Sequence, residues 1–76
     1  SQAQQMLDYM LRGRTLTGEQ AHDLFGTTAP ATRFSDVRRL IAKINSYDHS
    51  CHRMLCSESR AKGKKRWLEY SIKVVD

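Results

Sequence analysis

The stretch from Thr28 to Asn45 constrains the fold most, because it is amphipathic at helical spacing along almost its whole length. Apolar residues recur at intervals of three and four along one side, and polar residues recur along the other. A side built of small hydroxyls, a carboxylate and cations suits a polar, negatively charged surface such as a DNA groove better than a protein core. We therefore predict a helix over about residues 29–44, capped by Thr28. Its packing side holds Pro30, Phe34, Val37, Leu40, Ile41 and Ile44, and its outward side holds Thr28, Thr32, Ser35, Asp36, Arg39 and Lys43.

Two shorter helices are predicted before it. The first spans about residues 2–12 and ends before Gly13, because Met6, Leu7, Met10 and Leu11 form an apolar stripe of helical period. The second spans about residues 18–25 and ends at Gly26. Thr17 and Gln20 have the spacing of a capping box, Leu16 and Ala21 that of a hydrophobic staple, and the buried face is assigned to Leu24 and Phe25.

The C-terminal third changes to the two-residue period of β-strands. We predict a hairpin over about residues 51–74, with strands at 51–57 and 66–74 and a basic loop over 58–65 that contains Gly63. Residues 45–49 are expected to be a polar connection, and residues 14–16 a brief extended segment that enters a sheet. In the second strand, Leu68, Tyr70, Ile72 and Val74 share one face, and Trp67, Glu69, Ser71 and Lys73 share the other.

Charge is distributed unevenly along the 76 residues, whose formal net charge is +5. Residues 1–30 carry two basic and three acidic side chains, whereas residues 51–76 carry seven and three. Positive charge gathered in one part of so small a chain favours a nucleic-acid partner over a merely solubilising surface. The length fits one domain with a small core, so we expect a single domain over residues 1–76.

The predicted elements form an α+β, mainly α-helical fold. A short helix, a glycine-containing turn and a longer helix are typical of the helix-turn-helix, whose second helix enters the major groove. A hairpin with a basic loop after these helices is a wing, which would contact phosphates or the minor groove. The expected architecture is a winged helix-turn-helix with three helices followed by a C-terminal β-hairpin wing.

Several runs also resemble a family. Leu16–Gly26 followed by residues 31–38, and Gly63–Ile72 near the end, are similar to the small winged helix-turn-helix domains encoded by bacteriophages and prophages. The resemblance covers about residues 5–72 and implies DNA binding in a phage or mobile-element setting, in the cytoplasm of a bacterial host. It places Arg33, Asp36 and Arg38 at recurrent positions and Thr28, Thr32, Ser35 and Arg39 at variable ones. The sequence departs from the family after Leu40, where Ile41 and Ala42 replace an expected glycine-tyrosine turn.

These arguments predict double-stranded DNA as the partner, either for a homodimer or for a domain of a larger parent chain. Arg33 and Asp36 are three residues apart, so we expect an ion pair that braces the helix. The alternative is a winged helix that docks on a host regulator or polymerase through an apolar patch around Tyr47, Met54 and Trp67. The residues predicted to read base edges are Thr28, Thr32, Ser35 and Arg39, and those predicted to contact the DNA backbone are Arg38, Lys43, Arg60, Lys62, Lys64, Lys65 and Arg66.

Other chemistry finds little support in the sequence. His49, Cys51, His52 and Cys56 lack the paired spacing of zinc ligands, so no metal or other cofactor is expected. His22 and Asp23 are expected to point apart on a helix, and no nucleophile or phosphate-loop motif is present, so we expect no enzyme. Both cysteines are predicted to be reduced. Trp67 is expected to lie partly buried against a helix.

Overall fold

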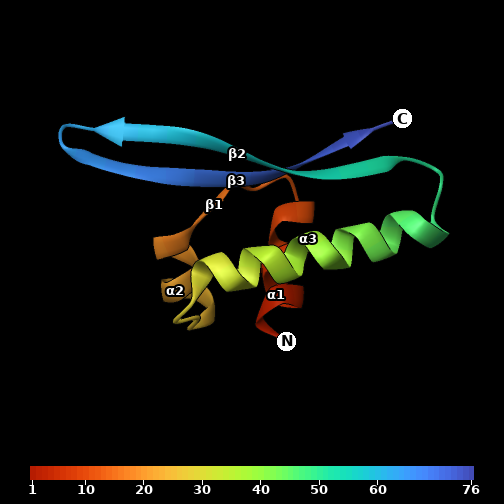
Figure 1. The fold of residues 1–76 in the computed structure, drawn as a ribbon, viewed down its shortest axis with the longest axis horizontal. Coiled ribbons are helices and arrows are strands. Elements are labelled where there is room, and N and C mark those ends of the chain that lie inside the picture. The colour runs from red at the N-terminus through yellow and green to blue at the C-terminus, as the bar shows by residue number, and fades with distance from the viewer.

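A computed structural model of the chain describes residues 1–76 and contains three helices and a three-stranded antiparallel sheet (Figure 1). The elements follow the order α1 (Gln2–Leu11), β1 (Leu16–Thr17), α2 (Gly18–Phe25), α3 (Pro30–Tyr47), β2 (His52–Lys62) and β3 (Lys65–Val75). The helices lie together on one side of the sheet. The fold class is therefore α+β, as predicted. The brief extended segment predicted over residues 14–16 overlaps the strand β1 only at Leu16.

The sheet has the strand order β1-β3-β2, so the last strand lies in the middle. β1 is only two residues long and pairs Leu16 with Tyr70 and Thr17 with Glu69. β2 pairs with β3 along its full length, from His52 opposite Val75 to Lys62 opposite Lys65. Because residues directly opposite each other share a face, this register decides which side chains of the hairpin turn toward the helices.

The core lies where α1, α3 and the sheet meet. Its nine buried apolar side chains come mainly from α1 and α3. The ring of Phe34 stacks on Tyr70 of β3 at a centroid distance of 3.8 Å and an interplanar angle of 15°, which fixes α3 against the sheet. The buried apolar residues are Ala3, Met6, Leu7, Met10, Leu16, Ala21, Phe34, Val37 and Ile41. The packing side predicted for α3 is thus confirmed at its centre.

The start of α2 is fixed as its sequence predicts. The Thr17 hydroxyl accepts a hydrogen bond from the Gln20 amide at 3.1 Å, and the Gln20 side chain accepts one from the Thr17 amide at 3.0 Å. Both donors would otherwise have no partner inside the helix. The buried face was predicted wrongly at one position, because Leu24 is 55% exposed and the short helix packs through Ala21 and Phe25 instead.

The ends of α3 differ from the prediction. Thr28 does not cap the helix; Ala29 occupies the cap position, and the buried Thr27 hydroxyl accepts from the Ala29 amide at 3.4 Å. At the other end, residues 45–47 continue the helix. The Asn45 side chain donates to the Arg53 carbonyl at 2.9 Å and accepts from the Arg53 amide at 3.2 Å, so it joins the last turn of α3 to β2.

The basic loop predicted over residues 58–65 was also wrong. β2 extends to Lys62 and β3 begins at Lys65, so only Gly63 and Lys64 lie between the strands. Gly63 has φ 61°, which glycine adopts without the steric cost that a Cβ brings. Every residue from 57 to 66 is exposed, and we refer to residues 57–66 as the hairpin arm. An arm that buries neither face carries no apolar alternation, so its sequence resembles that of a loop.

Candidate nucleic-acid interface

The outward side of α3 is open to solvent, as predicted. Thr32, Ser35, Arg39 and Lys43 recur at intervals of three and four along the helix, so they share one side, and all four are exposed. Thr28 is exposed as well but precedes the helix, in the turn after α2. Of the four residues predicted to read base edges, Thr32, Ser35 and Arg39 therefore lie on α3, and Thr28 lies in the turn before it.

Asp36 lies between two arginines on this side. Its Oδ2 is 3.3 Å from Arg33 Nη1, which confirms the predicted pair, and its Oδ1 is 3.4 Å from Arg39 Nη1. The second pair was not foreseen, although it has the same three-residue spacing. The Arg39 side chain remains 82% exposed and its bond is long, so its guanidinium is held weakly and can exchange partners.

The cations predicted to contact the DNA backbone fall into two groups, those with an ion-pair partner and those without one. Arg60 lies 3.0 Å from Glu58 and 3.4 Å from Glu69, and Lys65 lies 3.1 Å from Glu19 of α2. Their charges are partly neutralised. The other predicted backbone-contacting cations are exposed and form no ion pair: Arg38, Lys43, Lys62, Lys64 and Arg66.

The arm and the start of α3 lie at the same end of the molecule. The tip of the hairpin projects past α2 and past the N-terminal end of α3, which makes the molecule elongated, with extents of 41 × 24 × 18 Å (Figure 1). The hairpin tip, with its uncompensated cations, and the polar first turns of α3 thus lie at the same end of the molecule. This arrangement can meet a long polyanion at two places.

A second cluster fixes the opposite end of α3. The Asp48 carboxylate accepts hydrogen bonds from the Ser50 hydroxyl at 2.6 Å, from the Ser50 amide at 3.1 Å and from Arg53 at 2.8 Å. The bonds from Ser50, followed by that from Arg53, lower the pKa of Asp48 from 3.8 to about 2. The charged carboxylate therefore helps to hold the corner between α3 and β2.

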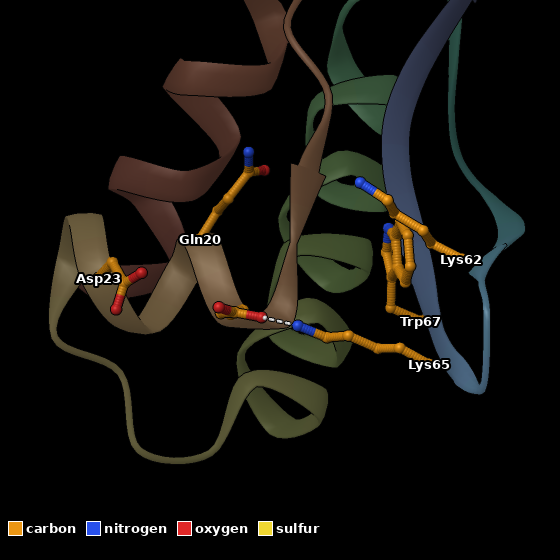
Figure 2. A pocket seen from close by; sticks show the side chains of 6 residues that line it. Gln20, Asp23, Lys62, Lys65 and Trp67 are labelled. Atoms are coloured by element: carbon orange, nitrogen blue, oxygen red, sulfur yellow. Dashed lines mark hydrogen bonds and ion pairs between the residues drawn. The ribbon is translucent and has the colours of Figure 1, made fainter.

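A cavity of about 360 Å³ opens between α2 and the hairpin (Figure 2). Glu19, Gln20 and Asp23 form its wall on α2, and Lys62, Lys65 and Trp67 form its wall on the hairpin. Trp67 is half-buried there, which confirms the predicted position against a helix. The acidic wall was not singled out from the sequence, although the four-residue spacing of Glu19 and Asp23 indicates one helix face.

The apolar patch expected around Tyr47, Met54 and Trp67 does not form one surface. Met54 is opposite Lys73 and Trp67 is opposite Arg60, so the two side chains are six positions apart along the hairpin, or about 20 Å at the usual rise of a strand. Trp67 belongs to the cavity beside α2, whereas Tyr47 and Met54 are 69% and 46% exposed.

The remaining candidates bring no reactive group together. Cys51 and Cys56 are free thiols, and no group of three histidine, cysteine or acidic side chains is placed to hold a metal ion. His22 and Asp23 were expected to point apart, yet their Nδ1 and Oδ1 atoms lie 3.3 Å from each other. Both side chains are free to turn because each is about two-thirds exposed. No helix combines the length and apolar character that crossing a bilayer requires.

Comparison with models of known families, with curated proteins and with solved structures gives no match.

Proposed function

We propose that this chain is a winged helix-turn-helix that binds double-stranded DNA. In this proposal α2 and α3 are the two helices of the motif, and the hairpin β2–β3 is the wing. The observation that carries it is that the polar start of α3 and the hairpin arm with its uncompensated cations lie at the same end of the molecule (Figure 1). A phage or mobile-element regulator is the setting that the sequence resemblance suggests.

Thr28, Thr32, Ser35 and Arg39 are proposed to face base edges in the major groove. Hydroxyls hydrogen-bond to several bases, and an arginine reads guanine through two bonds. Arg39 would leave Asp36 for the DNA, which its long, exposed ion pair permits. Arg33 keeps Asp36 as a partner at 3.3 Å, so the carboxylate would not be left unpaired.

The proposed phosphate contacts differ in strength according to whether each cation already forms an ion pair with a carboxylate. Arg38, Lys43, Lys62, Lys64 and Arg66 have no carboxylate partner and are the primary contacts. Arg60 and Lys65 contribute less, because their carboxylates must first be displaced. Five neutralised phosphates give a slope of log affinity against log salt of about −4.5.

The test is a titration of random duplex DNA at several salt concentrations, followed by fluorescence anisotropy. We expect the slope of about −4.5 for the unchanged chain and about −1.8 after Lys62, Lys64 and Arg66 are each replaced by glutamine. Lys73→Gln, which removes one charge outside the arm, should alter the slope by less than about 1. A salt-independent affinity, or no binding, overturns the proposal.

The alternative is a protein partner, such as a host regulator or polymerase. The exposed Tyr47 and Met54 favour it, since large apolar side chains in water are common in protein interfaces. In that case Arg39→Ala leaves binding intact and Tyr47→Ala weakens it. DNA binding predicts the reverse, with amide signals that shift within residues 28–43 and 60–66 when duplex is added.

A further inference from the structure

The outer edge of the sheet is a long, regular strand. β2 lies at the edge in the order β1-β3-β2, and its register with β3 continues from His52 to Lys62 without a bulge. No other element lies beyond it along the hairpin arm (Figure 1). An edge strand presents unpaired N–H and C=O groups, and proteins usually cover it, interrupt it with a bulge or keep it short. Along the hairpin arm, β2 shows none of these three protections.

The side chain of Asn45 shows which residues of β2 point their backbone groups toward this edge. It accepts from the N–H of Arg53 at 3.2 Å and donates to its C=O at 2.9 Å, as a neighbouring strand would. Backbone groups of successive residues in an antiparallel strand point to opposite sides, so every second residue repeats the direction of Arg53. On the arm these residues are Ser57, Ser59 and Ala61, which are exposed and whose backbone groups form no bond outside the hairpin.

We propose that this edge pairs with the same edge of a second copy of the chain, in antiparallel orientation, with Ser59 of both copies at the two-fold axis. In such a symmetric contact Ser59 lies opposite Ser59 of the second copy, and Ser57 lies opposite Ala61. The outward backbone groups of these residues would form about six hydrogen bonds between the copies. The interface goes beyond the proposed binding of DNA and does not depend on it.

The charges of the arm favour this register. It places Glu58 directly opposite Arg60 of the second copy, and symmetry repeats the contact. A contact centred on Glu58 would instead oppose two carboxylates, and one centred on Arg60 would oppose two guanidinium groups. Opposite charges in facing positions stabilise strand pairing, whereas like charges destabilise it. Within one chain Glu58 already faces Glu69, and Arg60 is the only cation paired with either, so a second guanidinium beside Glu58 is favourable.

The length of the open edge fits the same register. The arm turns at Gly63, so the turn of the second copy stops before it reaches Arg53 and leaves the Asn45 side chain in place. A contact centred on Ser57 would bring the second strand onto Arg53, whose backbone groups Asn45 already occupies. Asn45 therefore marks where the pairing ends.

The lysine at the end of β2 does not oppose this contact, although lysines on an edge strand often prevent pairing. Lys62 faces Cys56 of the second copy in the proposed register. The Lys62 side chains of the two copies lie at opposite ends of the interface, about 20 Å apart at the usual rise of a strand. This separation exceeds the Debye length of about 8 Å at physiological ionic strength, so the repulsion between the two tips is screened.

Sedimentation velocity of the whole chain without DNA tests the proposal, with a reducing agent to keep Cys51 and Cys56 from linking chains. We expect the sedimentation coefficient to rise toward that of a dimer between about 10 μM and about 1 mM. Ser59→Pro should weaken this association at least about tenfold, because proline removes the central N–H yet is tolerated on a free edge. A chain that stays monomeric at about 1 mM overturns the proposal and leaves the edge to an extended segment of another protein. Unchanged association of Ser59→Pro overturns it as well.

Exchanging two charges tests the register and leaves the backbone unchanged. Glu58→Arg and Arg60→Glu should each weaken self-association about tenfold, because like charges then face each other at two places. An equimolar mixture should recover the association, since opposite charges face each other again in the mixed dimer. Asp8→Arg and Arg12→Glu, the matched exchanges at exposed positions of α1 and its end, should change nothing. Unchanged self-association of either arm variant, or no recovery on mixing, overturns the register. Because no DNA is present, either result is separate from the salt dependence of duplex binding.

Discussion

The body of the molecule and the hairpin arm hold their shapes by different means. In the body, nine apolar side chains are buried, and α3 is fixed to β3 by the stack of Phe34 on Tyr70. In the arm, every side chain is exposed, and the strands are joined by their backbone hydrogen bonds and by the ion pair between Arg60 and Glu69 of β3. Hydrophobic burial therefore stabilises the body, while the arm is free to carry charge.

The largest effect is expected from the core. Phe34 is 2% exposed, so Phe34→Ala removes a buried ring and leaves a cavity, which should lower the free energy of unfolding by about 3–5 kcal/mol. Leu68 is 47% exposed on the strand just beyond the arm, and Leu68→Ala should cost less than about 1 kcal/mol. Urea denaturation measures both. Equal losses would contradict the conclusion that hydrophobic burial stabilises the body.

A smaller effect is expected at the corner between α3 and β2. The folded pKa of Asp48, about 2, lies below its ordinary value of 3.8, so its contribution to stability is full above pH 4 and is lost as the pH falls toward 2. Asp48→Asn should lower stability at neutral pH and remove this part of the acid loss. Denaturation midpoints measured from pH 5 to pH 2 test the prediction, which fails if the two proteins lose stability in parallel.

The smallest effect on global stability is expected at the tip of the arm. Gly63 has φ 61°, so Gly63→Ala should strain the turn by about 1–2 kcal/mol. Because the arm buries no side chain, the cost should appear as faster hydrogen exchange of its amides, with little change in the denaturation midpoint. Gly63→Asn should have a milder effect, since asparagine tolerates this conformation. A large shift of the midpoint would show that the arm supports the body.

The same difference explains how much of the fold the sequence could predict. Each helix buries an apolar stripe, so the periods around Met6 and Val37 predict α1 and α3 to within a few residues. The end of α3 was placed too early, because Asn45 and Tyr47 look like connection residues until Asn45 is seen to bond Arg53. Residues 58–62 were taken for a loop, because a strand with both faces in water lacks the two-residue apolar period.

The ion pairs of the candidate interface were likewise predictable only in part. The Arg33–Asp36 pair follows from spacing on one helix and could be predicted. The Lys65–Glu19 pair joins residues 46 positions apart, and Arg60–Glu69 depends on the register of the hairpin, so neither is visible in the sequence alone. Consequently the sequence identified the cations but could not tell which of them are already neutralised.

Thr17 takes part in two elements: it pairs with Glu69 of β3 in the sheet, and its hydroxyl caps α2. The hairpin is thus attached to the start of α2 through the two-residue strand β1, while its tip has no contact with the core. The pairing of Thr17 with Glu69 therefore connects β3 directly to the first turn of α2, the helix that precedes α3.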